Sequence, residues 1–407
     1  MEERFAPPEK FATALDELHE LVAREVGSAD FGAGDYLMGL RVLLQSMDFD
    51  PRFSERGRRI AWGEIVTALS ARARAVRSMA ETRDFDRHGL ARPIVITGIP
   101  RTGTTALHKL MAVDPQFQGL QGWLTGAPMP RPAREAWESH PLFQQAVERL
   151  NRRFEAVPTQ RAAHDMAAAE VDECCLVLRQ SFVSNLWTVV WPAASYDAWW
   201  QTQSELPAYR YLRRVLELIG CEEPEKRWLL KNPGHIANLD LLFAVFPDAL
   251  VIQTHRDPGQ AIPSLCAVLM KSHPLMEDGR ARERACLLGS RETDKWAKAV
   301  RDAERVRAAH RERILDVDHR EFHRAPMRVI QRIYGFLGLP LSSEVEAGMR
   351  ARVAAAPEMR HGKHHYRAAD FGLSEQEIRE RFGAYLERHG LGPRHSGVRA
   401  ASRMQGS

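Results

Sequence analysis

The chain has 407 residues, and its 57 lysines and arginines against 53 aspartates and glutamates give a formal net charge of +4. This length, with 44% hydrophobic residues, allows a large buried core and excludes an intrinsically disordered chain. A small positive balance spread along the chain favours a local pocket for an anionic ligand over an extended nucleic-acid surface. We therefore expect a folded protein that binds no nucleic acid.

The sequence also bears on membrane and redox context. No stretch approaches the roughly 18 uninterrupted apolar residues that a membrane helix needs. The first four residues carry acidic side chains where a signal peptide would have positive ones. The five cysteines lack paired CxxC spacing, which disfavours a zinc site or a disulfide framework. These features predict a soluble cytoplasmic protein without a membrane span and with reduced thiols.

Residues 1–90 show three apolar stripes with helical spacing, which predicts a helical N-terminal segment packed on the main domain. The stripes run from Phe11 to Val26, from Tyr36 to Met47 and from Ile60 to Val76. The same helices could instead form the interface of a homodimer or a gate over the substrate.

Short β-branched runs alternate with helical patterns from Arg92 onwards. Four runs have the character of buried strands, at residues 93–97, 227–231, 249–254 and 314–317. Helical patterns lie between them, for instance at residues 238–246 and 293–311. This alternation predicts an α/β fold with a parallel sheet flanked by helices, in which ligands bind at the carboxyl ends of the strands.

The pattern of the remaining residues predicts helical segments around this sheet and a tail. Residues 91–391 would form one α/β domain, within which residues 120–225 make a mostly helical insertion rich in tryptophan. We expect this insertion on the substrate side. The stretch from about Arg328 to Leu391 is helical again, and residues 392–407 are expected to form a flexible tail.

The sequence GIPRTGTT, residues 98–105, follows the first predicted strand and opens a helical pattern. Its two glycines, five positions apart, let the backbone fold around an anion that meets the first amides of the helix. This is the frame of the phosphate-binding loop G-x4-G-K-[ST], with Thr104 in the place of lysine. Because an ATPase uses that lysine on its nucleotide, its replacement disfavours hydrolysis of a nucleoside triphosphate. Arg101 supplies positive charge instead, and Thr104 and Thr105 supply hydroxyls.

A second motif, THRDPGQAIPS, spans residues 254–264 and ends another predicted strand. Asp257 is a favourable N-cap and Pro258 suits the first helical position, so we expect a helix to begin there. Arg256 then lies at the carboxyl end of the strand, and Ser264 lies about two turns into the helix. Together they could hold a second phosphate, with Arg256 in a forked contact.

Together, the two motifs resemble those of the sulfotransferases that use 3′-phosphoadenosine 5′-phosphosulfate (PAPS), in particular the large bacterial branch. The first motif is similar to their 5′-phosphosulfate loop and the second to their 3′-phosphate motif, with Arg256 and Ser264 at the family's eight-residue separation. The resemblance covers roughly residues 92–390. It implies a P-loop-like sheet, PAPS as co-substrate, transfer of a sulfuryl group to a hydroxyl acceptor, and no metal.

The resemblance also implies which residues bind the donor. They are Pro100, Arg101, Thr102, Gly103, Thr104, Thr105, Arg256, Ser264, His319, Lys363 and His364. The cytosolic eukaryotic members have lysine where this chain has Arg101, and His319 stands where a tyrosine near the adenine is common. The neighbouring histidines His361, His364 and His365 have a spacing that a metal could use, but a polar loop closing on the donor is the favoured interpretation.

The catalytic residues are expected at KNPGH, residues 231–235, which ends the second predicted strand. In the cytosolic sulfotransferases, a lysine and a histidine two residues later stabilise the leaving group and act as the base. The resemblance therefore implies these roles for Lys231 and His235, here four residues apart, with Arg101 also at the leaving phosphate. His235 suits a base because the ordinary pKa of histidine lies near neutrality. It could instead cap the next helix.

A carboxylate is the rival base, because some branches of the family use glutamate. The segment from Glu170 to Glu173 offers one, with Glu170 preferred, and the two would share a face if the segment were helical.

Two other functions compete with sulfuryl transfer. A P-loop kinase for small molecules would need Mg²⁺ and ATP, and the missing loop lysine and the second motif disfavour it. A non-enzymatic nucleotide-binding interaction protein would leave Lys231, His235 and the loop unexplained. For the acceptor, the tryptophan-rich insertion favours an apolar or lipid-like alcohol, although core packing would explain buried tryptophans equally well.

Overall fold

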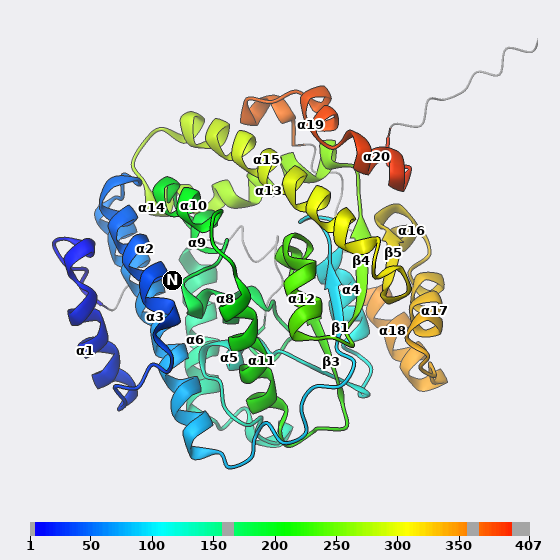
Figure 1. Cartoon of the computed structure of the whole chain (residues 1–407), viewed down its shortest axis with the longest axis horizontal. Coiled ribbons are helices and arrows are strands. Elements are labelled where there is room, and N and C mark those ends of the chain that lie inside the picture. Colours follow the sequence, from blue (N-terminus) through cyan, green and yellow to red (C-terminus); the bar gives the residue numbers. More distant parts are fainter. Residues whose placement is uncertain (1–4, 157–166, 356–365, 393–407) are drawn as a thin grey trace, which may run out of the picture.

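A parallel sheet of five strands forms the centre of the computed structural model, which describes residues 5–156, 167–355 and 366–392 (Figure 1). The strand order is β2-β3-β1-β4-β5, and every neighbouring pair is parallel. The strands are β1 (Ile94–Thr97), β2 (Phe117–Gly119), β3 (Arg227–Lys231), β4 (Leu250–His255) and β5 (Ile314–Asp318). The predicted α/β fold with a parallel sheet is therefore confirmed.

The sequence predicted four of these strands to within a residue at each end and missed β2. This strand has only three residues, and its sequence, Phe-Gln-Gly, has no β-branched side chain. It pairs with β3 alone, where Phe117 lies opposite Arg227. Pairing with a neighbouring strand therefore determines β2 more than its own composition does.

Side chains of the inner strands alternate between two cores, one on each face of the sheet. Ile94 and Ile96 of β1 pack on one face with α4 (Thr104–Met111) and α17 (Pro326–Leu337). Val95 packs on the other face with α11 (Leu206–Gly220). In Figure 1, α17 accordingly lies on the opposite side of the sheet from α11.

Further helices surround this sheet, and most of them pack into its two cores. Those between β3 and the end of the chain are α12 (Leu239–Val245), α13 (Pro258–Leu269), α14 (His273–Met276), α15 (Ala281–Arg307), α16 (His319–Arg324), α18 (Ser343–Ala355), α19 (Glu375–Arg381) and α20 (Gly383–His389). α15 begins at Ala281, earlier than the predicted start at Thr293, because its first turns carry arginine and glutamate that obscure the apolar stripe. The predicted tail lies almost wholly outside the described residues.

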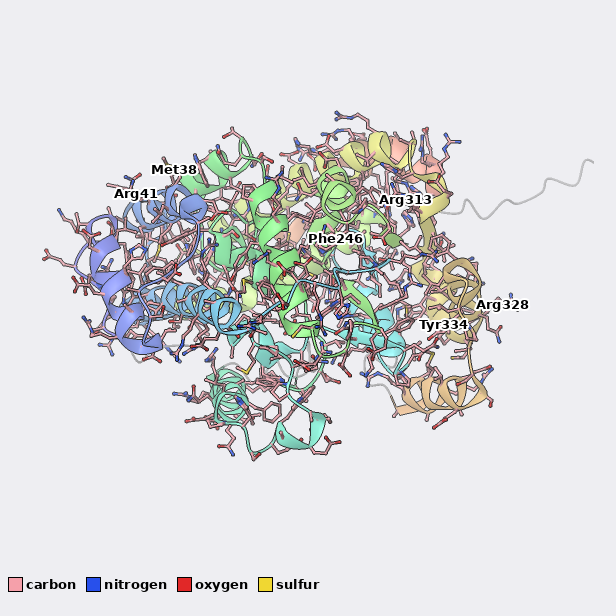
Figure 2. The ribbon with its side chains drawn as sticks, turned by 60° about the horizontal axis from the view of Figure 1, so that its bottom comes forward. Met38, Arg41, Phe246, Arg313, Arg328 and Tyr334 are labelled. Carbon is pink, nitrogen blue, oxygen red and sulfur yellow. The ribbon has the colours of Figure 1, made fainter. Side chains whose placement is uncertain are left out.

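The three predicted N-terminal helices are present as α1 (Leu15–Val26), α2 (Leu37–Phe49) and α3 (Glu55–Glu81). They share a third core with aromatic side chains of the insertion, among them Trp187 and Trp191. Figure 2 shows Met38 and Arg41 of α2 at the outer edge of the molecule. Within the described ranges, none of the helices has the length and apolar character that crossing a bilayer requires.

The insertion is helical, as predicted, and most of its tryptophans are core residues. Its helices are α5 (Gly122–Gly126), α6 (Pro141–Ala156), α8 (Cys175–Leu178), α9 (Trp187–Val190), α10 (Ala194–Trp200) and α11. The buried tryptophans are Trp123, Trp137, Trp187 and Trp191, whereas Trp199 and Trp200 are partly exposed. Core packing therefore accounts for four of the six tryptophans on which the apolar acceptor was predicted.

Candidate functional site

The phosphate-binding loop runs from the end of β1 to the start of α4. Gly98 and Gly103 have φ angles of 147° and 91°, and a side chain on Gly98 would collide with Thr254 of β4. Arg101 also has a positive φ, of 69°, at the tip of the turn. α4 begins at Thr104, directly after the loop, so its first amides face the space that the loop encloses. The local geometry is that of an anion-binding loop, as the sequence predicts.

Thr102 has a structural role within this loop. Its hydroxyl donates to the Ile99 carbonyl at 2.8 Å and lies 2.5 Å from the hydroxyl of Thr254. Thr254 in turn donates to the Thr97 carbonyl at 3.2 Å. The Thr102 side chain is buried and ties the loop to β4. Any contribution of Thr102 to donor binding would therefore come from its backbone.

The second predicted motif meets the loop directly. Arg256 follows β4, and its Nη1 donates to the carbonyl of Arg101 at 2.8 Å. Nε of Arg101 donates to the hydroxyl of Ser264 at 3.3 Å. Asp257 caps α13 by accepting from the amide of Gly259 at 2.8 Å, so the helix begins where the sequence predicts. The structure thus brings Arg101, Arg256 and Ser264 together.

The electrostatics of this cluster suit an anion. Burial lowers the pKa of Arg101, and burial followed by the nearby charge of Arg101 lowers that of Arg256. Two partly buried guanidinium groups that repel each other gain from a bound negative charge. Nε of Arg256 is also buried and has no hydrogen-bond partner in the described part of the chain. An orphaned donor of this kind fits a phosphate ligand.

His319, which the resemblance places near the adenine, lies beside the loop in the structure. It is the first residue of α16, and a side chain at Gly103 would meet its Cδ2 atom at 3.3 Å. Burial, and next the charge of Arg256, lower its pKa to about 3, so the ring is neutral near pH 7. A neutral, flat ring next to a phosphate loop can stack on a nucleobase. The predicted donor residues Lys363 and His364, with His361 and His365, lie outside the described residues.

Lys231 ends β3 and reaches the loop from the neighbouring strand. Its Nζ donates to the hydroxyl of Thr105 at 3.2 Å and to the carboxylate of Glu173 in a short contact. The side chain is 2% exposed. The lysine that the sequence assigns to the leaving group therefore lies next to a loop hydroxyl, at the carboxyl edge of the sheet.

Glu173, and not the preferred Glu170, is the carboxylate at this strand end. Glu170 accepts from Lys109 at 2.6 Å and lies 3.5 Å from Arg352. The segment is not helical, because Val171 forms an isolated bridge with Gln121. In an extended chain, residues three apart point to opposite sides, so the two carboxylates diverge. The two carboxylates therefore do not share a helical face, and Glu170 pairs with Lys109 and Arg352.

His235 is fully buried on the 3-10 helix Pro233–Asn238, behind Lys231. Its Nδ1 lies 2.7 Å from the hydroxyl of Tyr209, whereas Nε2 has no partner among the described residues. The ring does not cap the next helix, α12, because Nδ1 faces Tyr209 and Nε2 bonds no backbone amide among the described residues. Burial lowers the pKa of His235 to about 3, and the charge of Glu173 partly opposes this.

Acid should destabilise the fold through its buried histidines. His108 of α4, like His235, has a pKa lowered to about 3, chiefly by burial and next by the charge of Lys231, whereas its hydrogen bond to the Leu229 carbonyl opposes this shift. Both rings stay neutral in the folded state while the unfolded chain takes up protons below about pH 6.5. Their contribution to stability is therefore present above pH 6.5 and is lost as the pH falls towards 3.

Chemical denaturation at several pH values tests this expectation. The unfolding free energy should fall by a few kcal/mol between about pH 6.5 and about pH 4.5, where most carboxylates are still ionised. His108→Gln keeps a donor for the Leu229 carbonyl and should show a shallower fall than the wild type. Identical slopes for the two proteins would contradict the assignment.

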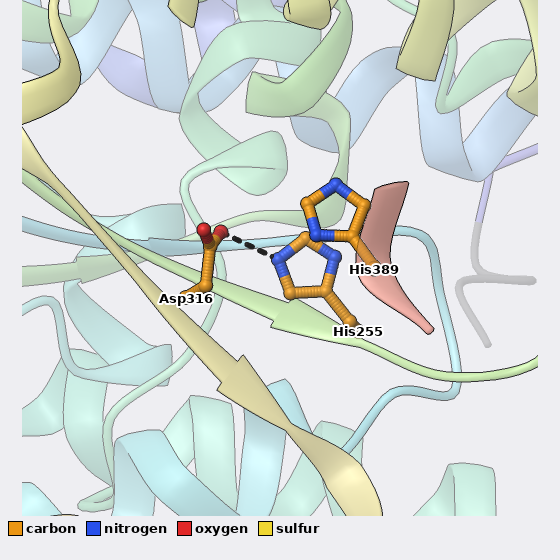
Figure 3. A group of neighbouring side chains, drawn as sticks. All are labelled: His255, Asp316 and His389. Atoms are coloured by element: carbon orange, nitrogen blue, oxygen red, sulfur yellow. Dashed lines mark hydrogen bonds and ion pairs between the residues drawn. The ribbon is translucent and has the colours of Figure 1, made fainter. Parts of the chain in front are cut away.

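A second cluster, His255, Asp316 and His389, lies where the second motif leaves β4 (Figure 3). Nε2 of His255 lies 2.7 Å from Asp316, whose two oxygens also accept from Arg307 at 2.8 Å each. The rings of His255 and His389 stack at 3.9 Å with 20° between their planes. Since imidazole lone pairs lie in the ring plane, two nearly parallel rings cannot both point at one ion. The cluster is better described as a polar connection between β4, β5 and α20.

The comparisons with known proteins agree with this site. A profile of the Sulfotransferase family matches residues 93–343. The chain therefore belongs to the sulfotransferase family. It is similar over 92% of its length to the crystal structure of sulfotransferase STF1 from Mycobacterium tuberculosis H37Rv, with 33% identity, a TM-score of 0.80 and 100% of that chain covered.

Two further relatives support the assignment. Sulfotransferase STF9 from Mycobacterium avium has 26% identity and a TM-score of 0.85, with 93% of this chain and 97% of that one covered. The omega-hydroxy-beta-dihydromenaquinone-9 sulfotransferase Stf3 from Mycobacterium bovis is 29% identical over 195 residues, which cover 46% of this chain and 48% of Stf3. The chain thus spans about half the length of the curated relatives it matches. The predicted family and the predicted enzyme class, a sulfotransferase, are confirmed.

Proposed function

We propose that the protein transfers a sulfuryl group from PAPS to the hydroxyl group of a small acceptor. The observation that carries this proposal is the convergence of three cations at one edge of the sheet. Arg256 donates to Arg101, and Lys231 reaches the hydroxyl of Thr105. A donor with one phosphate at its 3′ position and a phosphosulfate at its 5′ position would occupy both motifs at once.

Each part of the PAPS molecule has residues suited to bind it. The 5′ phosphosulfate would bind the loop amides from Pro100 to Thr105, together with the Arg101 guanidinium. The 3′-phosphate would bind Arg256, through its unpartnered Nε, and Ser264. His319 would lie against the adenine, and Lys363 and His364 are assigned to the donor by the family resemblance alone.

Sulfuryl transfer needs charge neutralised at the leaving phosphate and a proton removed from the acceptor. The acceptor oxygen forms a bond to sulfur as the bond from sulfur to the bridging phosphate oxygen breaks. Arg101 and Lys231 would stabilise the charge that develops on that bridging oxygen, so the reaction needs no metal. His235, the base expected from the sequence, and Glu173, the carboxylate in contact with Lys231, both lie at this strand end.

The acceptor we propose is a lipid-like or other apolar alcohol. Its support is the similarity to Stf3, whose name specifies an omega-hydroxylated dihydromenaquinone. The helical insertion would form the acceptor side, because it contributes Glu173, and the Cys174 amide donates to the Lys231 carbonyl at 3.0 Å. The N-terminal helices would support the insertion, with which they share a core, which favours this role over a mobile gate or a dimer interface.

A transfer assay in EDTA tests the proposal. The full chain would be incubated with [³⁵S]PAPS and three probes: a long-chain primary alcohol, an omega-hydroxylated isoprenoid and a simple phenol. We expect labelled organic sulfate from at least one apolar alcohol, with no loss of rate in EDTA. Parallel reactions with [γ-³²P]ATP and Mg²⁺ test the kinase alternative. Phosphorylated product from ATP without sulfated product from PAPS would overturn the proposal.

A further inference from the structure

The outer face of α2 carries apolar side chains that the rest of the fold leaves uncovered. Within the described residues, three large apolar side chains are exposed, and two of them lie on this helix: Met38, at 59%, and Phe49, at 82%. The exposed residues Arg41 and Gln45 lie between them, at helical spacings of three and four. These four side chains therefore form one outward stripe, about 16 Å long. Figure 2 shows its Met38 end at the outer edge of the molecule.

α10 packs beside α2 and places a tryptophan at the border of this stripe. A side chain at Gly39 would lie 3.3 Å from the ring of Trp199, which is partly exposed. Near the other end of α2, Asp50 accepts from the amide and the hydroxyl of Ser195 at 2.7 and 2.8 Å. The two helices are therefore joined at both ends of the stripe.

Positive charge accompanies the apolar side chains of the stripe. Arg41 lies within it and Arg52 follows Phe49 by three residues; both are exposed, and neither has an ion-pair partner among the described residues. Two neighbouring carboxylates bind backbone amides instead. Asp48 accepts from two amides before α1 at 3.0 and 2.9 Å, and Glu277 accepts from the Arg52 amide at 3.1 Å. We call this face the α2–α10 surface; its residues are Met38, Arg41, Gln45, Phe49, Arg52 and Trp199.

The mixture of apolar side chains and unpaired arginines favours a lipid surface over a second copy of the chain. In a symmetric dimer the stripe would face itself, so Arg41 would approach arginine with no carboxylate in the stripe to compensate. An anionic bilayer is complementary to the same residues. Arginine binds its headgroups, methionine and phenylalanine enter the boundary of the acyl chains, and tryptophan lies at the interface between them.

We propose that the α2–α10 surface binds the protein peripherally to an anionic lipid membrane, from which it takes a lipid-like acceptor. The membrane binding stands on the surface alone, whereas the supply of acceptor rests on the proposed function. The insertion connects the two, because it contacts both α2 and the end of β3. A side chain on Gly39 of α2 would collide with the Phe182 carbonyl of the insertion. Earlier in the insertion, Glu173 contacts Lys231.

Sedimentation with lipid vesicles tests the membrane binding. The full chain would be mixed with vesicles of phosphatidylcholine, either alone or with phosphatidylglycerol as the anionic lipid. We expect binding to the anionic vesicles, which should weaken as the salt concentration rises from about 0.1 M to about 0.5 M. Phe49→Ser and Arg41→Glu should each weaken this binding by roughly tenfold. Both substitutions are at exposed positions, so the fold should be unaffected.

Two matched controls test whether the effect belongs to this surface. Leu287→Ser changes the third exposed apolar side chain, on α15, and Arg328→Glu reverses a charge that Figure 2 shows across the molecule from Arg41. Both variants should bind vesicles as the wild type does. Equal losses in the controls, or no preference for anionic vesicles, would overturn the inference. A wild-type dimer that Phe49→Ser converts to a monomer, measured by light scattering, would overturn it in favour of a second copy.

The transfer assay separates the membrane binding from the proposed function. With an omega-hydroxylated isoprenoid embedded in the anionic vesicles, Phe49→Ser should slow sulfation in proportion to its weaker vesicle binding, while its affinity for PAPS stays unchanged. Equal rates for the variant and the wild type would overturn the link between membrane and acceptor. Vesicle binding by a protein that transfers no sulfate would refute the proposed function and leave the membrane binding in place.

Discussion

Replacing Arg101 by alanine should lower turnover by roughly a hundredfold to a thousandfold while weakening donor binding much less. The guanidinium lies at the tip of the phosphate loop, where the bridging oxygen of the donor would gain charge during transfer. A contact that strengthens as charge develops stabilises the transition state more than the ground state. Turnover under saturating PAPS, with product affinity from calorimetry, measures the two effects separately.

Two variants control this experiment. Arg101→Lys keeps the charge found at this position in the cytosolic eukaryotic members and should recover a substantial part of the turnover. Arg328→Ala removes an exposed arginine on α17, which Figure 2 shows at the outer edge of the molecule, and should leave turnover unchanged. Equal losses of substrate and product binding in Arg101→Ala, with normal turnover, would rule out the catalytic role.

Replacing Arg256 by alanine should weaken binding of adenosine 3′,5′-bisphosphate by about 3 kcal/mol, or roughly a hundredfold in Kd. The side chain is partly buried, so the phosphate would lose a charge-assisted partner that water cannot fully replace. Part of the loss would come from the loop itself, because Arg256 also donates to the Arg101 carbonyl. Calorimetric titration of wild type and variant gives the difference.

Adenosine 5′-monophosphate, which lacks the 3′-phosphate, distinguishes these two contributions. If Arg256 acts on the 3′-phosphate, the wild type should bind this analogue weakly and Arg256→Ala should bind it about as well as the wild type does. If the variant kept a preference for the 3′-phosphate, Arg256 would not be the residue that recognises it. A parallel loss for both ligands would instead indicate a damaged loop.

Local sequence signals predicted the parts of the site that depend on few neighbours. The loop needs glycine at two positions with positive φ and a helix that begins directly after them, and both features are visible in residues 98–105. The positions of Arg256 and Ser264 follow from the end of a strand, an N-cap and the spacing of residues along a helix. These signals are also local in the sequence. The position of Lys231 follows from β3, which begins and ends at the predicted residues.

The remaining parts depend on contacts between distant segments. Glu173 faces Lys231 because the chain around Val171 bridges to Gln121, which no local pattern records. The environment of His235 depends on Tyr209, 26 residues earlier in the sequence and on a different helix. Sequence spacing could place His235 at a strand end, but it could not show which ring nitrogen would be engaged.

Calorimetric titration of the wild-type chain tests the central claim most directly. Adenosine 3′,5′-bisphosphate, adenosine 5′-monophosphate and ATP with Mg²⁺ would be titrated separately, in buffer that contains EDTA for the first two. The proposed site predicts tight binding of the bisphosphate, binding of the monophosphate weaker by about a hundredfold, and the weakest binding for ATP with Mg²⁺. Tight binding of ATP with Mg²⁺, together with no preference for the 3′-phosphate, would contradict the assignment of this site to PAPS.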